Sequence, residues 1–236
     1  TTSIYYQWEN FANYTKSFGQ HTVTGMVGMS YQESTNDNVY GSLSANSEDA
    51  IKKNDPLFYY LNYGSASATK GVAGEKIRSA KLSYFGRVGY EFAGRYLLQG
   101  SLRADAADLS LLPSTNRWGY FPAVSAGWTL SEEEFFAPLK HQVSSLKLRA
   151  SWGQNGSLAA LSNYPYSTDM ALKGLYPFGT GNYYINAVAP SSMGNDKLKW
   201  ETSEQINIGL DARFLKDRLT VGMDYFNKKS KRFFFK

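Results

Sequence analysis

The chain has 236 residues, a formal net charge of +5, no cysteine and a mean hydropathy of −0.42. These values exclude a disulfide framework and a thiolate metal site, and no run approaches the roughly 20 apolar residues of a membrane-spanning helix. The basic residues are dispersed apart from those in 227–236, so nucleic acid is not an expected partner.

A period-two alternation of apolar and polar residues predicts β-strands along the chain. Over 200–214 the even positions, from Trp200 to Phe214, are mostly apolar, whereas none of the odd positions is. A helix would mix these two sets on every face, so the pattern predicts a strand. The same reasoning predicts eight strands in chain order, near 3–14, 20–33, 82–92, 96–106, 119–131, 146–152, 200–214 and 218–228.

Short reversals are expected within KSFGQ, YEFAGRYLL and FLKDRLT. In YEFAGRYLL, Gly94 supplies a left-handed turn conformation that a residue with a β-carbon resists. A connection of about a dozen residues joins TLSEEEFF to SSLKLRASW, and we expect it to hold one helical turn ended by Pro138.

Three other connections are longer and polar, over about 34–75, 107–118 and 155–199. Long and short connections therefore alternate, as they do in outer-membrane β-barrels with short periplasmic turns and long outer loops. A strand of about 13 residues, tilted about 45°, also rises roughly 30 Å, which is the thickness of the hydrocarbon core. The prediction is an all-β fold, an antiparallel transmembrane β-barrel in the bacterial outer membrane.

The alternation within the predicted strand at 119–131 indicates which side chains face outward from the barrel and which face its interior. Its outward face should carry Tyr120, Pro122, Val124, Ala126, Trp128 and Leu130. Trp118 and Tyr120 would lie in one aromatic belt at the membrane edge and Trp128 towards the other. The predicted inner face is charged, with Arg87, Glu91, Arg103, Asp105, Lys147, Arg149, Asp211 and Arg213.

Four segments, in this order, resemble a known family: SYFGRVGYEFAGRYLLQGSLRAD, NRWGYFPAVSAGWTLSEEEFF, LKLRASWGQNG and KLKWETSEQINIGLDARFLKDRLTVGMDYFNKKS. They are similar to the barrel of the SusC-like (SusC/RagA-type) TonB-dependent transporters of Bacteroidetes. The resemblance implies a barrel of about 22 strands plugged by an N-terminal domain, together with a segment that contacts TonB. It also implies a SusD-like surface lipoprotein as partner and oligosaccharides, or in some members peptides, as substrates.

The chain departs from that family pattern, since it shows no plug and about eight strands. It opens on TTSIYYQWEN, and we expect the plug, the TonB-contacting segment and any targeting segment to lie outside it. We therefore treat residues 1–236 as a partial barrel domain. The residues alone leave open whether eight strands close into a small barrel or form part of a wide one.

The outer loops are rich in aromatic residues, whose rings can lie against sugar faces or hold the loops together. The candidate substrate-binding residues are Tyr59, Tyr60, Tyr63, Tyr164, Tyr166, Tyr176, Tyr183 and Tyr184. His21 and His141 have no carboxylate cluster at ligand spacing, so neither a metal nor another cofactor is expected. No residue is nominated as catalytic.

Three functions compete at this point. The first is the barrel portion of a TonB-dependent importer of oligosaccharides or of peptides. The second is a complete small barrel with a structural or adhesive role. The third is an outer-membrane enzyme, which is disfavoured because His141 lies in a connection on the periplasmic side.

Overall fold

The computed structural model describes residues 1–44, 69–178 and 183–231. Its elements, in chain order, are β1 (Thr2–Phe18), β2 (His21–Ser44), β3 (Thr69–Phe92), β4 (Tyr96–Ala106), β5 (Trp118–Thr129), η3 (Leu130–Glu132), η4 (Glu134–Leu139), β6 (Val143–Ser157), β7 (Met170–Phe178), β8 (Tyr183–Pro190), β9 (Glu201–Phe214) and β10 (Leu219–Lys231). None of the helices described is long and apolar enough to cross a membrane.

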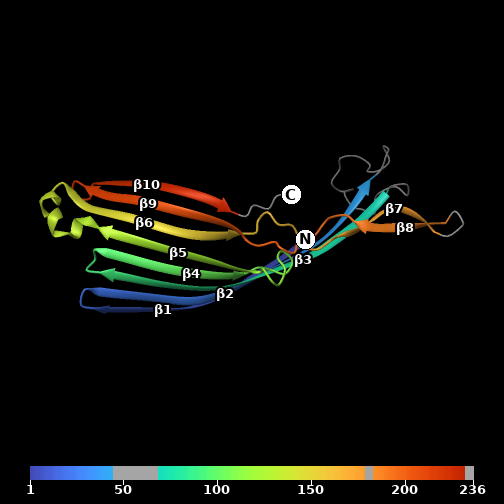
Figure 1. The fold of residues 1–236 in the computed structure, drawn as a ribbon, viewed down its shortest axis with the longest axis horizontal. Coiled ribbons are helices and arrows are strands. Elements are labelled where there is room, and N and C mark those ends of the chain that lie inside the picture. Colours follow the sequence, from blue (N-terminus) through green and yellow to red (C-terminus); the bar gives the residue numbers. More distant parts are fainter. Residues whose placement is uncertain (45–68, 179–182, 232–236) are drawn as a thin grey trace, which may run out of the picture. The chain divides into compact units, whose positions relative to one another are not determined.

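One eight-stranded sheet dominates the fold, in the order β1-β2-β3-β4-β5-β6-β9-β10 (Figure 1). The eight strands predicted from the alternation are confirmed. Each pairs with its neighbour in the predicted series, and the pairings from β3 to β10 are antiparallel.

Two of the predicted loops contain strands that the alternation did not show. Within 155–199, β7 and β8 form a separate two-stranded antiparallel sheet with a register shift between Leu172 and Leu175. Within 34–75, β2 continues to Ser44 and β3 begins at Thr69. Residues 34–38, STNDN, are polar on both faces, so the period-two signal disappears although the strand continues.

The chain divides into two units, one of Thr1–Gln7 with Gln32–Ala80 and one of Trp8–Tyr31 with Lys81–Lys236. In the first unit, a polar network joins three strands. The Glu33 carboxylate accepts hydrogen bonds from Arg78 Nε at 2.6 Å, Arg78 Nη2 at 2.8 Å and the Tyr6 hydroxyl at 2.5 Å. Polar bonds across strands therefore stabilise this unit.

In the second unit, the strand register separates an apolar face from a polar face. One row across six strands reads Tyr90, Leu98, Ala126, Ala150, Ile208 and Tyr225. The adjacent row, on the other face, reads Glu91, Leu97, Gly127, Arg149, Gly209 and Asp224. The apolar face is exposed, with Leu98 59% and Ile208 53% accessible. The two-faced sheet predicted from the sequence is confirmed.

Aromatic rings lie at both ends of the apolar face. Trp118 stacks on Tyr84 beside the long loops, with ring centroids 6.1 Å apart. Trp128 stacks on Tyr96 beside the short turns, with ring centroids 6.2 Å apart. The predicted opposite placement of Trp118 and Trp128 is confirmed by the register of β5. Leu130 was expected on the strand but lies in η3, because β5 ends at Thr129.

The short turns use left-handed backbone conformations. Gly94 has φ +68°, as expected. Gly19 also adopts a left-handed conformation, with φ +59°, and Ala93 has φ +53° beside Gly94. The predicted helical turn between β5 and β6 is instead two 3-10 helices. Pro138 lies inside η4 rather than ending it, which is compatible with its fixed φ and missing N–H near the helix end.

Candidate functional site

A small hydrophobic core lies where the long loops meet the sheet. It consists of Ala107, Leu112, Phe121 and Trp200, with Leu158, Leu161 and Leu198 packed against it. Trp200 meets Phe121 edge-on at 5.3 Å, and its Nε1 donates a hydrogen bond to the Arg117 carbonyl at 3.0 Å. Three connections, those after β4, after β6 and before β9, therefore pack together.

This core is built on the polar face of the sheet. Phe121 pairs with Arg103, which in turn pairs with Phe85, and the Arg103 guanidinium lies 5.7 Å from the Phe85 ring centroid. Phe121 is nevertheless only 7% exposed. Neighbouring strands do not cover a side chain that points away from the sheet, so the residues that bury Phe121 must come from the loops. The loops therefore lie over the polar face.

Two glycines make room for the Phe121 ring. A β-carbon at Gly119 would lie 2.5 Å from Phe121 Cζ, and one at Gly156 would overlap the same ring and Trp200. The loops can therefore approach the sheet closely because these two positions have no side chain.

One loop segment, 162–167, is fixed on the connection after β4. The Tyr164 amide donates to the Ser110 carbonyl at 2.5 Å, and the Tyr166 hydroxyl donates to the Leu109 carbonyl. The Tyr164 and Tyr166 rings meet edge-on, with centroids 6.3 Å apart. Tyr164 has φ +53° and is 54% exposed, whereas Tyr166 is half-buried.

The structure brings together two of the predicted tyrosines, Tyr164 and Tyr166. Tyr176 lies in β7, 60% exposed and paired with Ile185. Tyr183 and Tyr184 lie in β8, opposite Phe178 and Pro177, with side chains outside those described. Tyr59, Tyr60 and Tyr63 lie outside the described residues.

Sequence reasoning missed this core, including its two aromatic residues, Trp200 and Phe121. The alternation placed Trp200 at the start of the apolar face, and this was wrong. Trp200 precedes β9, which begins at Glu201, so its direction is set by loop packing and not by the strand pleat. Three leucines in the surrounding loops, Leu112, Leu158 and Leu161, were the available hint of a core.

Four of the charged residues predicted for the inner face, Arg103, Asp105, Arg149 and Asp211, form ion pairs on the polar face. Arg149 contacts Asp211 at 2.6 Å and Asp224 at 3.1 Å, which joins β6, β9 and β10. A β-carbon at Gly209 would lie 2.6 Å from Asp224 Oδ1 and 2.8 Å from Arg149 Cζ. Gly209 therefore gives this ion-pair group its space, and Asp224 joins the predicted set.

A second charged group lies nearer the loop end of the polar face. Asp105 is only 4% exposed, with Arg103 at 2.8 Å and Lys81 at 3.5 Å. Arg103 also donates to the Ser83 hydroxyl at 2.9 Å. Within the described residues, no three His, Asp or Glu side chains gather where a metal ion could bind.

The family model for the TonB dependent receptor-like β-barrel matches residues 1–235. The chain belongs to this family. The predicted resemblance to the TonB-dependent transporters of Bacteroidetes is confirmed, as is the β-barrel fold class.

Individual relatives support the same assignment. TonB-dependent receptor P39 of Formosa agariphila is 34% identical over 227 residues, which cover 94% of this chain and 20% of that protein. TonB-dependent receptor SusC of Bacteroides thetaiotaomicron is 38% identical over 158 residues, 64% of this chain and 15% of that protein. The matched part of this chain thus spans 20% of the length of P39 and 15% of the length of SusC.

The fold is shared with solved structures. The RagAB peptide importer in its open-open state superimposes with a TM-score of 0.77 at 23% identity, over 97% of this chain and 23% of that one. The structure of the RagAB peptide transporter gives a TM-score of 0.74 at 22% identity, over 97% and 24%.

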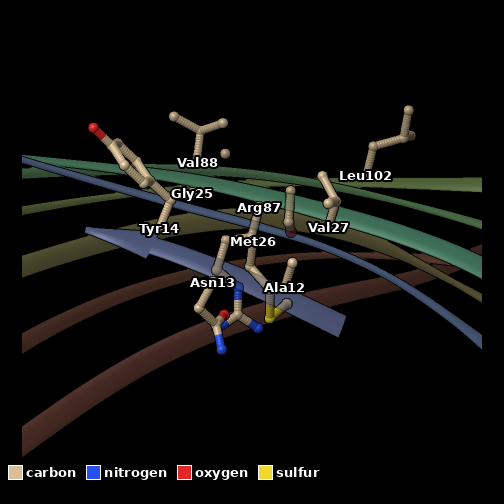
Figure 2. A pocket seen from close by; sticks show the side chains of 12 residues that line it. Ala12, Asn13, Tyr14, Gly25, Met26, Val27, Arg87, Val88 and Leu102 are labelled. Carbon is tan, nitrogen blue, oxygen red and sulfur yellow. The ribbon is translucent and has the colours of Figure 1, made fainter. Parts of the chain in front are cut away.

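In a TonB-dependent receptor-like barrel, the apolar face meets lipid and the polar face lines the interior. A hollow of about 630 Å³ lies against the strands. Figure 2 shows that the side chains lining it come from both faces of the sheet. Tyr14, Val88 and Leu102 point to one side of the strands, while Asn13, Met26 and Arg87 point to the other (Figure 2). Glycines on three strands, Gly25, Gly86 and Gly100, leave the hollow open. It lies in the lipid-facing surface and is therefore not a candidate for substrate.

Proposed function

We propose that this chain forms part of the wall and the outer mouth of a TonB-dependent outer-membrane importer. The observation that carries the proposal is the loop-covered Phe121 on the polar face, opposite an exposed apolar face. Such a sheet separates lipid from an aqueous interior, and the loop layer narrows one end of that interior. Its work is passage and binding, so no residue is assigned a catalytic role.

The edges of the sheet favour a wide barrel over a small closed one. In the described sheet, β1 and β10 lie at opposite ends of the strand order. Each unpaired backbone group at such an edge costs several kcal/mol in lipid. We therefore propose that further strands pair with β1 and β10, in a protein several times longer than 236 residues. This favours the importer over the small structural or adhesive barrel.

The proposed cargo is an oligosaccharide, and the proposed partners are TonB and a SusD-like surface lipoprotein over the loop end. The aromatic residues of the outer loops support a sugar ligand, because ring faces pack against the C–H groups of pyranoses. Peptide cargo is the second candidate, favoured by the structural likeness to the RagAB peptide importer.

Growth and uptake of a deletion strain test this function. A strain lacking the gene is grown on single oligosaccharides and on peptide mixtures, with the restored gene as control. We expect selective loss of growth on one class of oligosaccharide and loss of its uptake across the outer membrane. Selective failure on peptides would move the cargo to the second candidate, and unchanged growth and uptake on every source would contradict import.

The size and location of the native polypeptide test the wide barrel separately. An antibody against residues 107–118 should detect, in the outer-membrane fraction, a protein far larger than the 26.4 kDa of this chain. A band near that mass would instead support the small closed barrel.

A further inference from the structure

We propose that Tyr164 is a preformed sugar-contacting ring at the mouth of the barrel, and that Tyr166 positions it. This inference rests on the proposed importer function and deepens it, because it separates one ligand contact from the other loop tyrosines. The class of ligand is a neutral pyranose oligosaccharide.

The Tyr164 backbone is fixed before any ligand arrives. Its amide donates to the Ser110 carbonyl at 2.5 Å, and its carbonyl accepts a hydrogen bond from the Ser167 amide at 3.0 Å. Its φ of +53° is a conformation that a residue with a β-carbon rarely adopts. Such backbone persists only where the surroundings impose it, and it concentrates at functional positions.

The two tyrosine rings have different roles. The Tyr166 hydroxyl is committed to the Leu109 carbonyl, and its side chain is half-buried against the loop. The Tyr164 side chain is 54% exposed. The rings meet edge-on, with an interplanar angle of 64°, and an edge-on pair leaves at least one face of Tyr164 uncovered by Tyr166.

The position of Tyr164 over the interior follows from the core beneath it. The Ser110 and Leu109 carbonyls that hold the segment belong to the same connection as Leu112, which is fully buried in the core. That core covers Phe121 on the polar face of β5. Tyr164 therefore belongs to the layer that narrows the mouth rather than to the lipid side.

The chemistry around Tyr164 suits a neutral, hydroxyl-rich ligand. Residues 162–168 read SNYPYST and contain amide and hydroxyl side chains but no charged one. The segment itself therefore offers no ion pair to the termini or charged side chains of a peptide, whereas it can hydrogen-bond sugar hydroxyls beside a ring face. These features favour a sugar over a peptide.

Binding measured on the purified full-length protein tests the proposal. The probes are maltohexaose, cellohexaose and laminarihexaose, with hexa-alanine as the peptide probe. The variants are Tyr164→Ala, Tyr164→Phe and Tyr166→Phe. For the hexasaccharide that the unaltered protein binds, we expect Tyr164→Ala to raise the Kd about fivefold or more. Tyr164→Phe keeps the ring and should change the Kd by less than about twofold.

Tyr166→Phe distinguishes positioning from contact. It removes the hydroxyl bond to Leu109, so it should raise the exchange rate of the Tyr164 amide and weaken binding less than Tyr164→Ala does. Amide exchange over 107–117 serves as the folding control and should be unchanged in Tyr164→Ala. If Tyr164→Ala changes neither the amide exchange over 107–117 nor the Kd for the sugar, Tyr164 is not a ligand contact.

The remaining outcomes also decide the matter. Binding of hexa-alanine alone, or of none of the four probes, overturns the assignment to a neutral hexasaccharide ligand. The proposed function stands or falls separately, because uptake by the deletion strain does not depend on which residue contacts the cargo.

Discussion

The turn end and the loop end of the sheet use the same kinds of aromatic residue in opposite ways. At the turn end, Tyr96 and Trp128 lie on the apolar face, and both donate hydrogen bonds to Glu133, at 2.6 and 3.0 Å. At the loop end, Phe121 and Trp200 are buried on the polar side. The loop end thus buries its rings in a protein core, whereas Tyr96 and Trp128 at the turn end stay 43% and 36% exposed on the apolar face.

Truncation of Trp200 is expected to have the largest effect. Trp200→Ala empties the middle of the loop core, and such truncations cost about 3–5 kcal/mol. Amide exchange in the full-length protein should rise across 107–117 and 158–166, while the turn end stays protected.

Trp200→Phe provides the control, because it retains a ring against Phe121 and loses only the Nε1 bond to Arg117. Its effect should be much smaller. Uniform loss of protection across the whole sheet in Trp200→Ala would show that the loop core is not a local feature.

Overfilling the same core is the next largest change. In Gly156→Val, the added side chain meets Phe121 and Trp200, and overpacking of this kind costs about 1–3 kcal/mol. Limited proteolysis should then cut within 107–117 or 158–166. Gly100→Ala is the matched control, since a β-carbon there meets nothing within 4 Å. Equal cleavage of the two variants would contradict the close packing at Gly156.

The difference between the two ends also explains what could be predicted from the sequence. Local alternation predicts the eight strands, their two faces and the position of the Trp128 ring at the turn end. Within a strand, odd and even positions lie on opposite faces, so the sequence position alone decides the face on which a side chain lies. The alternation gave a wrong or incomplete prediction where this odd–even rule does not apply. At Trp200 the strand has not yet begun, and over 34–38 both faces of the strand are polar.

The candidate site was only partly predictable for the same reason. The tyrosines of 162–184 are visible as a composition, but nothing in the chain order shows that Tyr164 lies against Ser110, 54 positions away. Contacts between loops depend on which strands are neighbours and how the loops fold over them. The exposure that separates Tyr164 from Tyr166 therefore came only with the structure.

The hairpin turn at the turn end tests backbone conformation without packing. Gly94 has φ +68° and a β-carbon there meets nothing within 4 Å. Gly94→Ala should therefore destabilise the β3–β4 hairpin by about 1 kcal/mol, through its left-handed conformation alone. The rate of amide exchange at residues 92–96 measures this loss of hairpin stability. Gly94→Asn should be milder, because Asn tolerates that conformation, and an equal effect of both variants would contradict the conformational cause.

Glu133 at the turn end should give the smallest and most specific effect, visible only as a function of pH. Its carboxylate accepts hydrogen bonds from Tyr96, Trp128 and Arg95, the last at 3.2 Å. The Tyr96 bond, then the Trp128 bond and the nearby Arg95 charge, hold the pKa of Glu133 below its ordinary value of 4.5. A lowered pKa means that the carboxylate stabilises the folded connection above pH 4.5 and that this contribution is lost as the pH falls below it.

Glu133→Gln isolates that charge, since glutamine keeps the shape and one acceptor oxygen. Amide exchange over 130–139 in the unaltered protein should rise as the pH is lowered through the acid range, beyond the intrinsic pH dependence of exchange. In Glu133→Gln the connection should already be less protected at neutral pH and should show no further loss in acid. Because Glu133 lies at the opposite end of β5 from residues 107–117, the loops at 107–117 should be unaffected in both proteins. Parallel pH curves for the two proteins would mean that the rings at the turn end are held by stacking and lipid, without the carboxylate.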